Sequence, residues 1–272
     1  KSRNASIADT LLEAHKVAQT EAKEVVLTGV NIGDFGQNGD ETFFDLVKEL
    51  DQVQGVDRFR ISSIEPNLLT DEIIEYVAQS KRFVPHFHIP LQSGNNKQLR
   101  MMRRRYKREL YADRVATIKR LMPHCCIGVD VIVGFPGETE EDFLETYRFV
   151  NELDISYLHV FTYSERVNTP AAEMENPVPM AERRRRNEMM RILSEKKRRH
   201  FYAQHENSTR SVLIETNKSD GKMVGLTDNY IKVLLENDPV LENTICKVGL
   251  SEVLPDGTMK GEIVNVGKEF LV

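Results

Sequence analysis

The first two thirds of the chain alternate between two hydrophobic periodicities. Apolar residues three or four positions apart predict helices, and the short apolar runs between them predict buried strands. We expect helices at residues 7–18, 43–50, 71–79, 97–102, 109–122 and 140–153. We expect strands at residues 24–28, 58–63, 86–90, 125–134 and 157–163. This alternation predicts an α/β domain built on a parallel sheet.

The number and rhythm of these units fit a TIM-type barrel or part of one. A doubly wound sheet is the alternative that the pattern leaves open. In both folds the ligand binds beyond the carboxyl ends of the strands, so the residues that end each strand are candidates for a site. Every predicted strand here ends in polar residues or in a glycine turn, and we expect these ends to form one pocket.

The most informative strand end follows residues 125–134. Glycines on either side of Pro136 let the backbone approach a ligand, and the proline fixes the bend. Thr139 is expected to cap the next helix, whose acidic first turn suits its positive end. Alone, this turn is equally consistent with an ordinary capped loop, so its interpretation as a ligand site depends on the other strand ends.

The pattern changes after residue 176. A proline-containing connector leads into a long helix, and short strands separated by turns follow it. Asp220-Gly221 and Asp256-Gly257 are turn signals, and five short strands predict a small antiparallel β-barrel. We therefore expect an α/β domain at residues 1–176, a basic linker helix at residues 177–206 and a β-barrel at residues 207–272.

Composition narrows the class of protein. The 272 residues carry a net charge of −5, so an argument for nucleic acid binding must rest on local basic patches. Three cysteines, none in a C-x-x-C spacing, are typical of buried thiols in a reducing compartment rather than of a metal site. No apolar run approaches ~20 residues, so we expect no membrane partner and a cytoplasmic protein.

Two basic runs stand out, one at residues 97–108 and one at residues 181–200. Each is consistent with a solvated charged face and with a phosphate-binding surface, and the sequence leaves both interpretations open. The side chains that we expect to bind RNA are Arg103, Arg104, Arg105, Arg183, Arg184, Arg185, Arg186, Lys196, Lys197, Arg198 and Arg199.

Six stretches of the chain resemble the radical S-adenosylmethionine (SAM) enzymes, and more narrowly the methylthiotransferases that modify adenosines of tRNA. Their shared order is far more specific than any one of them, and they cover nearly the whole α/β portion. The resemblance implies a partial TIM-type barrel of the radical SAM kind followed by a TRAM-like β-barrel. The stretches are Leu27–Gly33, Arg60–Pro66, His88–Gly94, Met102–Tyr106, Asp130–Glu138 and Tyr163–Ala171.

The resemblance also implies that the strand ends bind SAM. Each implied residue has an ordinary alternative as a cap, a turn or a loop residue. The implied residues are Gly29, Val30 and Asn31 at the methionine part, Ser62, Ser63 and Glu65 at the ribose and methionine ends, Gln92 as a hydrogen-bonding partner, Val133, Gly134 and Pro136 beside the adenine, and Phe161 and Tyr163 stacking on it.

One feature departs from the family pattern. Radical SAM enzymes bind a [4Fe–4S] cluster through C-x3-C-x2-C, and this sequence has no such motif. Lys1–Ile7 resembles the segment after the cluster loop, so we expect a fragment without that loop, the first strand and an N-terminal domain. Cys125 and Cys126 cannot substitute, because adjacent strand residues point to opposite faces. We therefore expect this fragment to be inactive.

By this resemblance, the full-length protein adds a methylthio group to N6-threonylcarbamoyladenosine next to the anticodon of tRNA. The implied cofactors are SAM and two [4Fe–4S] clusters, and the implied partners are tRNA and an electron-donor protein. We expect no catalytic residue in this fragment, because the cofactors perform the difficult chemistry. Two alternatives stay open: a methylthiotransferase acting on an aspartate of a ribosomal protein, and a non-catalytic RNA-binding module.

Overall fold

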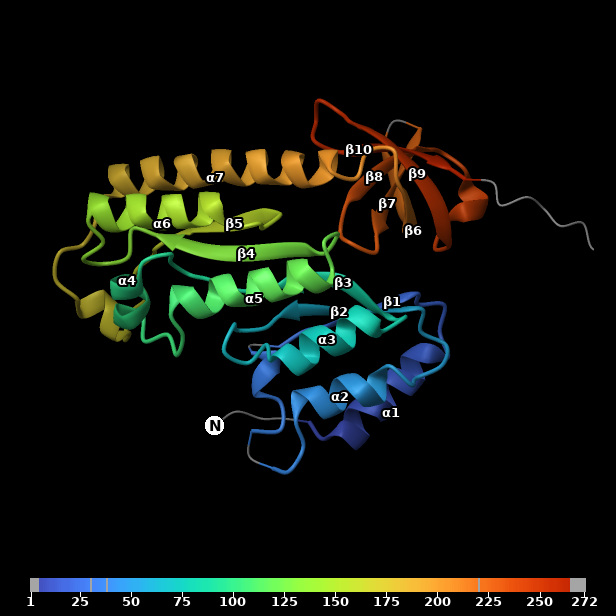
Figure 1. Ribbon diagram of the computed structural model, residues 1–272, viewed down its shortest axis with the longest axis horizontal. Helices are drawn as coiled ribbons and strands as arrows, with labels where there is room; N and C mark the ends of the chain where they lie inside the picture. The colour runs from blue at the N-terminus through green and yellow to red at the C-terminus, as the bar shows by residue number, and fades with distance from the viewer. Residues whose placement is uncertain (1–4, 30, 38, 220, 265–272) are drawn as a thin grey trace, which may run out of the picture.

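Five parallel strands in sequential order form the main sheet of the protein (Figure 1). The computed structural model describes residues 5–264 except residues 30, 38 and 220, and leaves the side chains of residues 216–219 undescribed. The order β1-β2-β3-β4-β5 has no reversal point, so the partial barrel is confirmed and the doubly wound alternative is wrong. The strands are β1 (Glu24–Leu27), β2 (Arg58–Ser63), β3 (Phe83–His88), β4 (Cys126–Val133) and β5 (Tyr157–Thr162).

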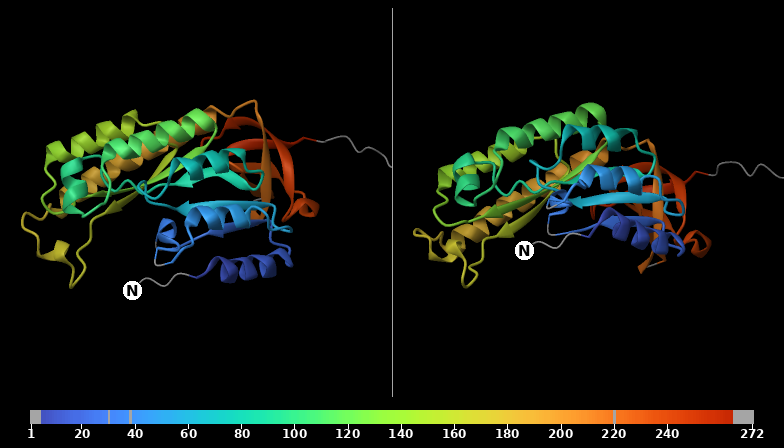
Figure 2. Two further views of the ribbon diagram at one scale, coloured as in Figure 1. Left: turned by 60° about the horizontal axis from the view of Figure 1, so that its bottom comes forward. Right: turned by 90° about the horizontal axis from the view of Figure 1, so that it is seen from below.

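Helices cover the outer face of this curved sheet (Figure 2). They begin where capping chemistry predicts: the Thr139 hydroxyl accepts from the Asp142 N–H, and the Asp142 carboxylate accepts from the Thr139 N–H. Apolar strand residues such as Phe59, Phe87 and Val129 pack beneath the helices in one core. The covering helices are α1 (Ile7–Ala18), α2 (Phe43–Leu50), α3 (Asp71–Gln79), α5 (Arg108–Leu121) and α6 (Glu140–Glu152), and the short α4 (Asn96–Met101) lies at the carboxyl end of the sheet.

The long helix α7 (Met180–Ala203) lies along β5, the last strand of the sheet. The Ser194 hydroxyl accepts from the Leu158 N–H at 2.8 Å and donates to the Leu158 carbonyl at 2.9 Å. These bonds satisfy backbone groups at a sheet edge that would otherwise be open to pairing. Leu193 joins the core of the sheet, and Phe201 joins the core of the small barrel. The helix is therefore packed against both parts of the molecule.

The C-terminal strands form the predicted closed five-stranded barrel. Four neighbouring pairs are antiparallel, and β8 and β10 are parallel. Directions cannot alternate around a ring with an odd number of strands, so one parallel pair is unavoidable. The strands are β6 (Thr209–Ser219), β7 (Lys222–Thr227), β8 (Lys232–Glu236), β9 (Ile245–Val253) and β10 (Met259–Ile263).

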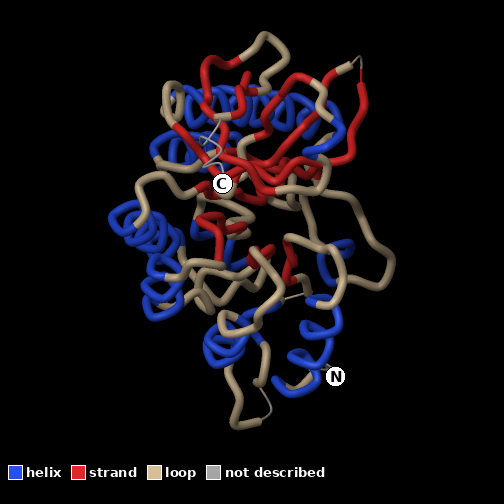
Figure 3. The backbone as a smooth tube through the Cα atoms, turned by 90° about the vertical axis from the view of Figure 1, so that its right-hand side faces the viewer, coloured by secondary structure: helices blue, strands red, loops and turns tan. Residues whose placement is uncertain are grey.

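The small barrel packs against the amino ends of β2 and β4. Figure 3 shows the molecule from the side on which this barrel lies. Arg58, the first residue of β2, donates to the Ser211 hydroxyl of β6 at 2.8 Å. At the opposite edge, where the strands end, lie the loops that carry the predicted site. None of the described helices combines the length and apolar character needed to cross a bilayer.

Candidate functional site

The ends of β3, β4 and β5, which are predicted to bind a ligand, lie side by side at the carboxyl edge of the sheet. Val133 pairs with Thr162, and the Tyr163 N–H donates to the Val133 carbonyl at 2.9 Å. Gln92 forms a parallel bridge with Val131, so the loop after β3 lies beside β4. The buried Gln92 has a φ of +68°, a conformation that non-glycine residues rarely adopt outside special sites.

A cavity of about 820 Å³ opens beside the ends of β4 and β5. Its size is in the range of small-molecule sites, and its walls are largely apolar. Phe161 is 51% exposed, an unusual state for a phenyl ring, and it faces this cavity. Tyr163 also lines the cavity, and its hydroxyl is buried with no hydrogen-bond partner in the described chain. A flat apolar ligand with a polar group would satisfy both features.

The first two strand ends carry further polar groups. Asn31 precedes a short 3-10 turn, and its amide donates to the Asp34 carboxylate at 2.8 Å. The Asn31 side-chain oxygen is buried without a partner among the described residues. Glu65 forms an ion pair with Arg104 at 2.9 Å, and Arg104 also lines the cavity. These contacts link the loop after β2 to the cavity wall.

The other residues that we predict to bind SAM belong to the ends of β1 and β2. Gly29 follows β1, and Ser62 and Ser63 are the half-buried last residues of β2. Ser63 pairs with His88 of β3. Val30 lies outside the described residues. The contacts of these residues with SAM stay predictions.

In the glycine turn after β4, another side chain of the protein fills the space beside Gly134. Gly134 has a φ of +76°, and its N–H donates to the Glu138 carboxylate at 2.7 Å. A Cβ atom at Gly134 would lie 2.4 Å from Cγ of Arg183, so the residue that approaches this glycine is an arginine. Val133 and Pro136 are buried. Their place beside an adenine stays a prediction.

Arg183 and Arg186 are internal residues of α7, 3% and 4% exposed. Arg186 pairs with the buried Glu138 carboxylate at 2.7 Å. Burial raises the pKa of Glu138, while the Gly134 N–H and Arg186 favour its ionised form. Arg183 donates to the carbonyl oxygens of Val178 and Tyr163. Both guanidinium groups bond protein groups, and Arg186 holds α7 against the glycine turn, so their role in RNA binding stays a prediction that this packing does not favour.

The other arginines and lysines predicted to bind RNA differ in their exposure and in whether an internal partner already holds them. Arg103 and Arg105 are exposed at the end of α4 and have no ion pair among the described residues, and the same holds for Arg184 and Lys196 on α7. Arg185 pairs with Glu140 and Glu182. Arg198 and Arg199 share Glu195, and Lys197 donates to the Asn151 carbonyl. Of these predicted cations without an ion pair in the described ranges, Arg103 lines the cavity, and Arg105 follows two residues later.

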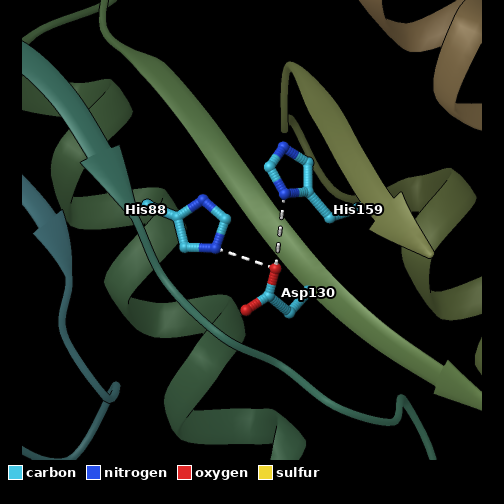
Figure 4. A group of neighbouring side chains, drawn as sticks. All are labelled: His88, Asp130 and His159. Atoms are coloured by element: carbon cyan, nitrogen blue, oxygen red, sulfur yellow. Dashed lines mark ion pairs between the residues drawn. The ribbon is translucent and has the colours of Figure 1, made fainter. Parts of the chain in front are cut away.

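Sequence reasoning missed one cluster on the inner face of the sheet. His88, Asp130 and His159 come from β3, β4 and β5, and their side chains point toward one another (Figure 4). His88 Nε2 lies 2.9 Å from Asp130 Oδ1. Burial and the neighbouring His88 lower the pKa of His159, although Asp130 opposes this shift. The available signal was a polar residue in an otherwise apolar strand, on the face that alternation assigns to the barrel interior.

Comparison with known proteins decides the family. The model of the radical SAM superfamily matches residues 1–150, more than half of the chain. The chain belongs to the radical SAM superfamily. Its resemblance to methylthiotransferases is confirmed by curated relatives, which this chain matches over most of its own length.

Three relatives illustrate this similarity. Threonylcarbamoyladenosine tRNA methylthiotransferase MtaB of Bacillus subtilis (strain 168) is 42% identical over 246 residues, 88% of this chain and 54% of that protein. Its Aquifex aeolicus (strain VF5) counterpart is 36% identical over 87% of this chain and 56% of that protein. The tRNA-2-methylthio-N(6)-dimethylallyladenosine synthase of Desulfitobacterium hafniense (strain Y51) is 33% identical over 88% and 55%. The radical SAM chain spans about half the length of these relatives.

The superfamily uses SAM and a [4Fe–4S] cluster, and the residues present fit the first better than the second. The unpartnered oxygens of Tyr163 and Asn31 suit a ligand that is polar at several points. Cluster ligation needs thiolates, whereas burial raises the pKa of the Cys126 thiol to about 12. Cys246 lies on β9 of the small barrel, and no cysteine joins a group of possible metal ligands among the described residues. The three cysteines of this chain therefore do not form a cluster site.

Proposed function

We propose that this chain forms the SAM-binding barrel and the C-terminal β-barrel of a methylthiotransferase acting on tRNA. The proposed target is N6-threonylcarbamoyladenosine next to the anticodon. The observation that carries the proposal is the 42% identity to a relative named for this activity, combined with a nucleoside-sized cavity at the carboxyl edge. The Aquifex aeolicus relative named for the same substrate supports the choice.

In this proposal Phe161 and Tyr163 of the cavity, together with Asn31 after β1, bind and orient SAM. Phe161 stacks on the adenine, and its exposed ring is free to do so. The Tyr163 hydroxyl and the Asn31 side-chain oxygen, both unpartnered and buried, take hydrogen bonds to the sugar or the methionine part. SAM together with its cluster supplies the methyl group and the radical chemistry. The apolar walls exclude water from the reacting centre.

These residues provide neither the ligands of a [4Fe–4S] cluster nor its reductant. No C-x3-C-x2-C motif occurs in the sequence, so we propose that the 272 residues alone do not catalyse methylthiolation. In the whole enzyme an electron-donor protein would deliver the reducing equivalents, and each of two clusters would need its own cysteines. A tRNA substrate implies that the enzyme works in the cytoplasm.

The proposed tRNA surface lies next to the SAM cavity. Arg103 lines both this cavity and a neighbouring hollow of about 850 Å³, which Arg100, Arg105 and Lys107 also line. Cations without internal partners are free to neutralise phosphates. A tRNA backbone held there would bring an unstacked anticodon-loop base toward the cavity mouth. Arg184 and Lys196 on α7 offer further contacts.

Nucleoside analysis tests the proposal. The complete gene that encodes this chain should be expressed in a bacterial host deleted for its own threonylcarbamoyladenosine methylthiotransferase. We expect mass spectrometry of digested tRNA to show 2-methylthio-N6-threonylcarbamoyladenosine, which the empty host lacks. A second host, deleted for its dimethylallyladenosine synthase, serves as the specificity control. Methylthiolation restored only in the second host would reject the proposed substrate, and restoration in neither would reject the activity.

A further inference from the structure

The cluster of His88, Asp130 and His159 is built from three neighbouring strands in fixed register. Asp130 lies directly opposite His159, and His88 pairs with Gly128, two residues before Asp130. Side chains two residues apart share a face, so all three project from the inner face of the sheet. Paired strands hold their side chains more firmly than loops do, and a preformed ligand set needs such a frame.

The nitrogen and oxygen atoms of the cluster converge on one point (Figure 4). His88 Nε2 and His159 Nδ1 lie 2.9 Å and 3.9 Å from the same oxygen, Oδ1 of Asp130. One atom from each residue falls within 4.8 Å of the other two. Bonds of ~2.0–2.2 Å to one ion imply ligand atoms roughly 3–3.6 Å apart, which these separations nearly match.

Hydrogen bonding alone leaves part of this arrangement unexplained. At 3.9 Å from Asp130, His159 Nδ1 is beyond hydrogen-bond range, and this ring makes no hydrogen bond within the described part of the chain. One carboxylate oxygen that faces two imidazole nitrogens is the arrangement that a shared cation organises.

The cluster is also open to ligands on one side. The His159 side chain is 55% exposed, whereas those of His88 and Asp130 are 13% and 20% exposed. No fourth histidine, cysteine or carboxylate joins the group among the described residues. Three protein ligands with a free position are typical of sites that bind water or substrate, while structural sites close all four positions.

We propose that His88, Asp130 and His159 form a binding site for a divalent transition-metal ion, with its free position facing the barrel interior. His159 and Asp130 lie two residues before Phe161 and Ile132 on the same face, and both of those residues line the SAM cavity. At ~3.3 Å per residue, the ion would sit roughly 7 Å below the cavity. It would hold a nitrogen or oxygen atom of a molecule that enters the barrel. This site does not depend on the proposed substrate.

Calorimetric titration with Zn²⁺ tests the site on the 272-residue chain after treatment with a chelator. We expect one equivalent of Zn²⁺ to bind. His159→Ala and Asp130→Asn should each weaken binding by roughly 10-fold or more, because even changes to residues around metal ligands cost 10–100-fold. His159 is exposed and asparagine keeps the shape of aspartate, so both variants should fold, and circular dichroism checks this.

Two matched controls separate this site from other zinc ligands. His15→Ala removes an exposed imidazole from α1, and Cys246→Ser removes the thiol that is not fully buried. Both controls should keep the affinity of the parent chain. No saturable binding by the parent chain would overturn the proposal. So would affinity that persists in His159→Ala and Asp130→Asn, because the ion would then be held elsewhere.

Discussion

The side-chain amide of Asn229 donates a hydrogen bond to Nε2 of His205, with the two nitrogens 2.8 Å apart. The same amide donates to the His124 carbonyl at 3.0 Å. His205 Nδ1 bonds the Phe201 carbonyl at 2.8 Å, so this ring carries its proton on Nδ1 and is neutral. One buried amide thus ties the end of α7, a loop of the small barrel and the start of β4 together.

This bond makes the interface sensitive to acid. Burial lowers the pKa of His205 below 6.5, with added repulsion from Arg210 and Lys119, although the Phe201 carbonyl and Asp228 oppose the shift. A depressed folded-state pKa means that the stabilisation is present above about pH 6.5 and is lost as the pH falls through the folded value. We expect urea denaturation to give a smaller free energy of unfolding at pH 5.5 than at pH 7.5.

The matched variants for this prediction are His205→Gln and His200→Gln. Glutamine at position 205 cannot titrate, so it should make the pH dependence shallower, with the remainder coming from His86, His124 and His159, whose pKa values burial also lowers. His200 is exposed on α7, and its replacement should leave the profile unchanged. An unaltered profile in His205→Gln would show that another group causes the acid sensitivity.

The basic run of α7 separates into structural and exposed arginines. Arg186→Ala would leave the Glu138 carboxylate buried and without its guanidinium partner. Losing one partner of a buried ion pair typically costs about 3–5 kcal/mol. Arg184→Ala removes an exposed side chain of the same type two residues away and should hardly change the free energy of unfolding. Chemical denaturation compares the two, and equal losses would contradict the assignment.

Local patterns made most of the fold predictable. Helix and strand periodicities located the elements of the sheet domain, and the sequential α/β rhythm indicated the barrel. The start of β3 at Phe83 was missed because Pro85 interrupts the strand pattern. The parallel pairing of β8 and β10 depends on closure of the whole ring, which no local pattern encodes.

Less of the candidate site could be predicted from the sequence. Arg183 and Arg186 belong to a charged run, yet they share a helix face with the buried Met190 and Leu193, at offsets of 3, 7 and 10 residues. That spacing was the available signal that both are internal. The cluster of His88, Asp130 and His159 depends on the register of three strands, which a single sequence does not specify.

The proposed tRNA surface predicts a change in salt dependence. Arg103→Gln combined with Arg105→Gln should weaken tRNA binding and lower the slope of log K against log salt by roughly 0.7–0.9 for each phosphate that the variant no longer neutralises. Arg120→Gln is the control, because Arg120 is exposed at the other end of α5, near the amino edge of the sheet. Filter binding across a salt series gives both slopes. Equal slopes for the double variant and the control would place the tRNA elsewhere.

We propose above all that the carboxyl edge of the sheet binds SAM against Phe161. Equilibrium dialysis of the chain with labelled SAM tests it directly. Stacking of a base on an aromatic ring contributes about 1–3 kcal/mol, so Phe161→Ala should weaken binding by roughly 5- to 150-fold. Leu12→Ala, a similarly exposed apolar residue on α1, should bind SAM like the parent chain. Unchanged affinity in Phe161→Ala would contradict the assignment of this cavity.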